Sequence, residues 1–288
     1  MPTIEERRAR KAERRAKQRE ITILRAGKMH KARMLAEAVP ATSALPAPPS
    51  LNIGCSGWFY WHLKGSFYAT QMPTKEWFGH YAEHFSTVEL NAPFYSWPTL
   101  KTVESWHKQA EGTDMVYTVK ASELITHIKK FEDTETLVQD FGYIADLLGP
   151  RMGCFLFQLP PSYHYSADRL HQILQQLDPT RRNVIEFRHT SWWTEKVYAA
   201  FEQAGAIFCS CSGPRLPDVL VKTAADIYVR FHGVQRWYRH DYSHDELVMW
   251  ANRIRDAGAD RVWVYFNNDF DGYAIKNAKM LSEILSAG

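Results

Sequence analysis

The sequence predicts an α/β protein, a (β/α)8 TIM barrel preceded by a basic helical N-terminal extension. Short β-branched or aromatic runs alternate with segments of helical periodicity eight times after residue 50. The 238 residues that carry this alternation match the roughly 250 residues of a typical barrel of this kind. A doubly wound open sheet is the alternative. Its nucleotide-binding versions are disfavoured because neither GxGxxG nor GxxxxGK[ST] follows any predicted strand.

The first 50 residues differ in composition from the rest of the chain. They hold 12 Lys and Arg against 5 Asp and Glu, net +7, whereas the remaining residues hold 23 against 27, net −4, and all 39 aromatic residues. A segment without aromatics and with this charge cannot bury a core. Good helix formers follow a capping box at Thr3 and Glu6, so we predict a long exposed helix within a basic arm, residues 1–39. Four prolines predict a stiff linker at 40–50, which leaves 51–288 for the barrel.

The basic arm has two interpretations. Its apolar residues are too scattered for a sustained heptad seam, so a solvated helix without a partner is one of them. The other is an arm that contacts nucleic acid or the ribosome through residues 1–39, because clustered Lys and Arg attract phosphates. The scattered apolar positions are Ile21, Leu24, Met34 and Leu35.

The elements of the barrel follow from residue patterns along the chain. Predicted strands are 51–56, 87–91, 115–120, 154–159, 183–188, 206–211, 227–232 and 261–267. Predicted helices are 74–85, 99–110, 134–148, 167–177, 193–204, 244–257 and 272–286. Between the sixth and seventh strands the pattern predicts only a short or irregular piece.

Cysteine use and hydropathy indicate the compartment. The four cysteines form no CxxC pair, which in a chain of this size favours a reducing, cytoplasmic location over a disulfide scaffold. Apolar runs such as 262–266 are far shorter than the roughly 20 residues of a membrane span. We therefore expect no membrane partner.

Polar side chains gather at the ends of the predicted strands. Alternation along a strand places three pairs on common faces, namely Glu89 with Asn91, Glu186 with Arg188, and Arg230 with His232. In a parallel barrel all the C-terminal strand ends open on one face. The predicted mouth therefore holds Glu89, Lys120, Gln158, Glu186, Arg188, Arg230, His232 and Asn267. Burying so many polar groups is costly unless they pair with each other or with a ligand, so we favour a ligand-binding mouth over a purely structural network.

This mouth suggests acid/base chemistry. Two carboxylates among cations can be driven to different pKa values, so we assign Glu186 as the general base and His232 or Glu89 as the acid or orienting partner. The substrate-binding groups would be a cationic clamp, orienting amides and an aromatic wall. The clamp is Lys120, Arg188 and Arg230; the amides are Gln158, Asn267 and Asn91; the wall is Trp58, Tyr60, Phe94, Tyr95 and Trp192. Rim packing over the barrel is the alternative interpretation of the aromatic residues.

The predicted mouth contains few metal ligands. The residues with suitable atoms at strand ends are Glu89, Glu186, His232 and Asp269. Three cations beside them disfavour a cluster of divalent ions and favour a phosphate or carboxylate group. We therefore predict no metal or other cofactor, although one divalent ion stays compatible with these residues.

Six motifs in order give the chain a family resemblance. They are GCSGWFYW (54–61), VELNAPFY (88–95), FQLPPS (157–162), IEFRHTSW (185–192), VRFHG (229–233) and YFNND (265–269). From about residue 51 to the C-terminus the chain resembles the YecE-like family, domain of unknown function seventy-two. The resemblance implies a TIM barrel, and some members are compared structurally with endonuclease IV, a metal-dependent DNA repair barrel. The basic arm lies outside it.

Together these observations predict an enzyme, a hydrolase or lyase that acts on an anionic, phosphate-bearing small molecule or nucleotide by acid/base chemistry. One alternative is a nucleic-acid-binding protein or an endonuclease IV-like metal-dependent nuclease that uses the basic arm. Another is a barrel kept as a non-catalytic interaction module.

Overall fold

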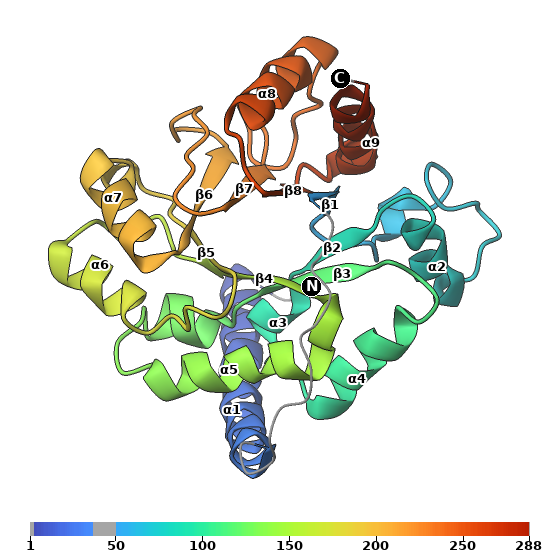
Figure 1. Ribbon diagram of the computed structural model, residues 1–288. Coiled ribbons are helices and arrows are strands. Elements are labelled where there is room, and N and C mark those ends of the chain that lie inside the picture. Colours follow the sequence, from blue (N-terminus) through green and yellow to red (C-terminus); the bar gives the residue numbers. More distant parts are fainter. Residues whose placement is uncertain (1–2, 37–49, 288) are drawn as a thin grey trace.

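The computed structural model describes residues 3–36 and 50–287 (Figure 1). Eight strands form a closed barrel in sequence order, and every neighbouring pair is parallel, with β1 closing on β8. The predicted barrel is confirmed, and each strand lies within two residues of its predicted bounds. The strands are β1 (Leu51–Cys55), β2 (Thr87–Leu90), β3 (Val116–Lys120), β4 (Met152–Gln158), β5 (Asn183–Glu186), β6 (Ile207–Ser212), β7 (Asp226–Phe231) and β8 (Arg261–Phe266).

Helices cover the outside of the barrel (Figure 1). They are α2 (Trp77–Ala82), α4 (Leu100–Gln109), α5 (Glu135–Leu148), α6 (Ala167–Leu174), α7 (Glu195–Ala204), α8 (His244–Asp256) and α9 (Tyr273–Ser286). All seven predicted helices are present. Several short helical pieces were not predicted, among them α3 (Ala92–Tyr95) and a π-helical turn (Leu124–Ile128). A single turn is too short to show helical periodicity in a sequence. No helix of the described residues is both long and apolar enough to cross a membrane.

The barrel interior changes in character along its axis. Toward the N-terminal ends of the strands it is filled by apolar side chains that include Val116, Cys154, Val184 and Trp263. In the middle, the Tyr265 hydroxyl lies 2.6 Å from the Thr87 hydroxyl and 2.8 Å from that of Thr118. Beyond this layer the inward-facing residues are charged. Cys209 and Cys211 are buried free thiols in the interior, as predicted.

The N-terminal helix α1 (Ile4–Ala36) is present, but the prediction that the whole helix is exposed is wrong. Its C-terminal half packs against α5 and buries Thr22, Ala26 and Met29. The Arg33 Nε donates to Asp140 Oδ1 at 2.8 Å. A hydrophobic pattern does not reveal this contact because two of the three buried side chains, Thr22 and Ala26, are small, while the apolar Leu24 faces solvent. The predicted linker at 40–50 lies almost entirely outside the described residues.

Substituting Ala26 by glutamate should detach this half of α1. Ala26 is 4% exposed, so a carboxylate at this position would be buried without a partner. We expect amide hydrogen exchange in residues 18–36 to accelerate by roughly tenfold or more. The matched control is Leu24→Glu, because Leu24 is 66% exposed on the other side of the helix. Equal exchange in both variants would contradict the docked arrangement.

Candidate active site

Glu186 is the centre of a buried charge network at the C-terminal ends of the strands. It is the last residue of β5 and is fully buried. Arg188 Nε donates to its Oε1 at 2.6 Å, and Arg230 Nη1 from β7 donates to its Oε2. His232 Nε2 lies 3.3 Å from the same Oε1. Strand alternation therefore brings Glu186, Arg188, Arg230 and His232 together in the barrel interior, as the sequence predicted.

Arg230 links this carboxylate to a second one. Its Nη2 donates to Glu89 Oε1 at 2.6 Å, and the Tyr228 hydroxyl donates to Glu89 Oε2 at 2.7 Å. Arg230 and Glu89 are both fully buried. Because both terminal nitrogens of Arg230 are engaged by carboxylates, Arg230 neutralises buried negative charge in the barrel interior. Its place in the substrate clamp stays a prediction.

The electrostatics of the network disfavour Glu186 as a general base. Burial alone raises the pKa of a carboxyl, but Arg188, Arg230 and His232 outweigh burial and hold the pKa of Glu186 well below its usual range. A carboxylate of this kind is a weak proton acceptor. Burial, followed by repulsion from Arg188 and Arg230, lowers the pKa of His232 to about 3, so its ring is neutral near pH 7. A neutral ring can donate one hydrogen bond and accept one, whereas the imidazolium form would be needed for a charged acid.

Lys120 is a cation of this network whose pKa is shifted toward neutrality. It ends β3 and is 8% exposed at the mouth. Burial and repulsion from Arg230 lower its pKa to about 7, despite the opposing effect of Glu186 and Glu89. Its Nζ donates to Gln158 Oε1 at 2.7 Å and lies 4.3 Å from the centre of the Phe94 ring. An amine that is half-protonated near pH 7 can both bind an anion and exchange a proton.

The predicted aromatic wall forms only in part. Tyr95 is 62% exposed on the rim, and Tyr60 lines a cavity at the mouth. Trp192 is fully buried, stacked on Phe187 at 4.0 Å, and therefore belongs to the core. Trp58 packs edge-on against Phe78 of α2. For the fully buried Trp192 the packing interpretation is correct and the wall assignment is wrong, whereas the half-buried Trp58 stays a predicted member of the wall.

Two aromatic residues that the sequence analysis did not select lie beside Arg188. The Arg188 guanidinium lies 4.4 Å from the centre of the Trp237 ring, and its Nη1 donates to the Tyr238 hydroxyl at 3.3 Å. Both follow β7 by several residues, in a loop without a recognisable period. Their position directly after the VRFHG motif was the available signal.

A cavity of about 430 Å³ opens beside this loop, lined by Tyr60, Trp237, Tyr238 and Asn267 among others. It also contains a pair that the sequence analysis missed, His62 Nε2 at 3.1 Å from Asp269 Oδ2. Burial raises the pKa of Asp269 to about 6.

Two of the predicted orienting amides lie in different places. Asn267 Nδ2 lies 3.4 Å from His232 Nδ1, at the network. The Asn91 amide instead donates to the Ser56 carbonyl at 3.0 Å and supports the rim.

A divalent metal fits this site poorly. Glu186, Cys211 and His232 are the one set of described residues whose ligand atoms lie within 4.8 Å of one another. Both oxygens of Glu186 already accept from arginines, and Arg188 Nη2 lies 3.2 Å from His232 Nε2. Two guanidinium groups in contact with the ligand atoms oppose a further divalent charge.

Zinc titration tests this conclusion. We expect no rise in the melting temperature on adding Zn²⁺, and no fall on adding EDTA, because the ligand atoms are already engaged. A rise that scales with the logarithm of zinc concentration, and is lost in Cys211→Ser, would contradict this expectation.

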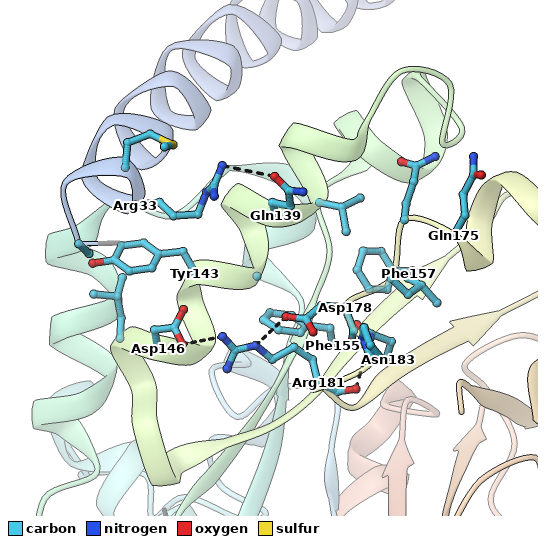
Figure 2. A pocket seen from close by; sticks show the side chains of 18 of the residues that line it. Arg33, Gln139, Tyr143, Asp146, Phe155, Phe157, Gln175, Asp178, Arg181 and Asn183 are labelled. Carbon is cyan, nitrogen blue, oxygen red and sulfur yellow. Dashed lines mark hydrogen bonds and ion pairs between the residues drawn. The ribbon is translucent and has the colours of Figure 1, made fainter. Parts of the chain in front are cut away.

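A second, larger cavity lies away from the mouth. It has a volume of about 1170 Å³ and lies on the outer side of the barrel between the end of α1, α5 and the loop before β5 (Figure 2). Its polar side chains pair with each other, as in the 2.6 Å contact of Arg181 Nη2 with Asp146 Oδ1. Burial, followed by repulsion from Asp146, raises the pKa of Tyr143 in its lining.

Comparison with known proteins places this barrel in a family. A family model described as "Protein of unknown function DUF72" matches residues 52–288. The chain belongs to the DUF72 family. The UPF0759 protein YunF of Bacillus subtilis is 26% identical over 82% of the chain and 94% of that protein. The UPF0759 protein YecE of Escherichia coli is 28% identical over 40% of the chain and 42% of that protein.

Solved DUF72 structures share the fold. A DUF72 protein of Thermotoga maritima superposes with a TM-score of 0.75 at 24% identity and covers 83% of this chain and 100% of its own. One from Enterococcus faecalis gives 0.70 at 17% identity, covering 82% and 95%. The family match begins at residue 52, so helix α1 precedes the DUF72 segment of this chain.

Proposed function

We propose that this DUF72 protein binds an anionic, phosphate-bearing small molecule or nucleotide at the C-terminal barrel mouth and acts on it by acid/base chemistry. The observation that supports this proposal is Lys120, a nearly buried amine with a pKa of about 7 at the edge of a charge network. Shifted pKa values of this kind cluster at functional sites.

The two carboxylates of the network are paired with arginines, so the ammonium group of Lys120 is available to a ligand. The carboxylates of Glu89 and Glu186 are matched by the guanidinium groups of Arg230 and Arg188. Lys120 has no carboxylate within ion-pairing distance among the described residues, and Gln158 is its hydrogen-bond acceptor. A bound anion beside its Nζ would supply the missing countercharge and raise the pKa of the amine, which couples binding to proton uptake.

Lys120 also replaces Glu186 as the proposed proton acceptor. In its neutral form it can remove a proton from a substrate or a water molecule, and the resulting ammonium can return the proton to a leaving group. Glu186 then acts as a positioning residue that fixes Arg188 beside the mouth. A hydrolase or a lyase fits this one-group acid/base cycle.

Sulfate is a suitable probe for the anion site because its charge does not change near pH 7. We expect wild-type affinity for sulfate, measured by calorimetry, to fall up to tenfold per pH unit as the pH rises above about 7, because Lys120 loses its proton. Lys120→Met should abolish binding, and the control Lys101→Met, on the exposed surface of α4, should not.

Equal sulfate binding by wild type and Lys120→Met would overturn the proposal. If sulfate binds as expected but no nucleotide or phosphate ester is turned over, the protein is an interaction module and the acid/base step is refuted.

A further inference from the structure

We propose that the N-terminal half of α1 binds the phosphate backbone of nucleic acid and holds it above the barrel mouth. Side chains from Ile4 to Lys17 are all exposed, whereas the second half of the helix is docked on α5. This first half therefore presents a free helical surface. The binding part of the inference is independent of the site at Lys120; only the use of a bound strand by the mouth rests on the proposed function.

Charges on this surface are segregated by sign. At 100° per residue, the basic side chains occupy one broad face and the acidic side chains a narrow stripe opposite to it. The basic face holds Arg7, Arg8, Arg10, Lys11, Arg14, Arg15, Lys17 and Arg19. The acidic stripe holds Glu5, Glu6, Glu13 and Glu20. A face with eight cations and no acidic residue complements a polyanion.

The contacts of α1 fix which end of the barrel this face approaches. Arg33 and Met34 border the cavity beside Leu147, near the end of α5, and Arg33 contacts Asp140 in its middle. Farther toward the N-terminus of α1, Arg25 donates to the Trp97 carbonyl, in the connection that leads from the C-terminal end of β2 through α3 to α4.

Helix α1 thus runs in the same direction as α5, which begins at the C-terminal rim of the barrel and runs toward the N-terminal ends of the strands. Its N-terminal half extends past that rim, and Figure 1 draws it fainter and therefore farther from the viewer than the C-terminal half.

The basic face also points to the barrel side. Positions 11, 15, 18, 22, 26, 29 and 33 follow one another at intervals of three or four residues and so form a single row along the helix. The C-terminal part of this row contains the buried Thr22, Ala26 and Met29, which face the barrel. The N-terminal part of the row contains Lys11 and Arg15. A nucleic-acid strand bound to Lys11 and Arg15 would therefore lie on the side of α1 that faces the barrel mouth.

Nucleic acid fits this surface better than a membrane does. Between Glu5 and Glu20 the uncharged residues are Ala9, Ala12, Ala16 and Gln18. An amphipathic helix that lies on a bilayer needs large apolar side chains on one face. The free half of α1 has a second charged face instead, so its affinity must come from phosphate contacts alone.

The test uses the full chain and a short fluorescein-labelled RNA, followed by fluorescence anisotropy at several salt concentrations. The variant replaces Arg7, Lys11, Arg14 and Arg15 by alanine, which preserves helix propensity and leaves the docked half intact. We expect its affinity to fall by roughly tenfold or more and the slope of log affinity against log salt to become shallower by about 2 to 4. The matched control, Glu6→Ala with Glu13→Ala, should bind as tightly as wild type or tighter.

Equal RNA and duplex DNA binding by wild type and the alanine variant would overturn the inference, and so would tight binding to phosphatidylserine vesicles without binding to either nucleic acid. Sulfate binding at Lys120 provides the separate readout. If the alanine variant loses RNA but keeps sulfate, the arm acts as inferred. If sulfate never binds but RNA binding depends on the arm, the proposed function fails and the inference about the arm stands.

Discussion

Glu186→Gln is expected to destabilise the protein by about 3–5 kcal/mol, the largest loss that we predict for one substitution. The glutamine keeps the shape of the side chain but removes the carboxylate that Arg188 contacts and one of the two carboxylates that Arg230 contacts. Arg230 is fully buried, so water cannot replace the lost charge. Urea denaturation monitored by tryptophan fluorescence measures the change.

The control for this variant is Glu195→Gln, an exposed residue in the first turn of α7, which should change stability by less than about 0.5 kcal/mol. The double variant Glu186→Gln with Arg188→Met should lose less than the sum of the two single losses, because one unpaired charge has been removed. Additive losses, or a Glu186→Gln protein as stable as the control, would show that Glu186 is not the centre of the network.

Lys120→Met is expected to have the opposite effect on stability near neutral pH. The folded-state pKa of Lys120 is lowered to about 7 from its ordinary 10.5. Between these two values the unfolded chain binds a proton that the folded protein does not bind, so wild-type stability falls as the pH decreases from about 10.5 to about 7 and is then unaffected by this group. A methionine side chain cannot bind a proton, so Lys120→Met avoids this loss of stability at lower pH.

The variant should therefore gain about 3–4 kcal/mol relative to wild type on going from about pH 10 to about pH 7. Urea denaturation of both proteins at the two pH values measures the difference, and the other titrating groups cancel in it. Lys101→Met should show no such pH-dependent gain. A constant stability difference between Lys120→Met and wild type across this range would mean that Lys120 has an ordinary pKa. A gain in stability with a loss of sulfate binding is the expected trade-off at a functional residue.

Most of the fold could be predicted because each barrel strand carries a strong local pattern. Strands such as β7 and β8 are short β-branched and aromatic runs, and the helices between them have clear periodicity. The docking of α1 could not be predicted, because Thr22 and Ala26 are not residues that a hydrophobic pattern selects. A tertiary partner, here α5, decides whether such a face is buried.

The grouping of the candidate site residues could be predicted, but their contacts could not. Strand alternation correctly grouped Glu186, Arg188, Arg230 and His232. A sequence does not show which partners each side chain finds, and these partners set the pKa values. Two arginines make Glu186 a weak base, whereas burial without a carboxylate makes Lys120 a group that titrates near neutrality. The His62 contact with Asp269 joins distant loops and has no local signature.

The most direct measurement of this account is the titration of the lysine side chains by NMR. Protein labelled with carbon-13 at the lysine ε position gives one signal for each lysine, and Lys120→Met identifies the signal of Lys120. We predict that this signal titrates with a midpoint near pH 7 and that sulfate moves the midpoint upward. A midpoint close to that of the exposed lysines, unchanged by sulfate, would contradict both the buried amine and the anion site built around it.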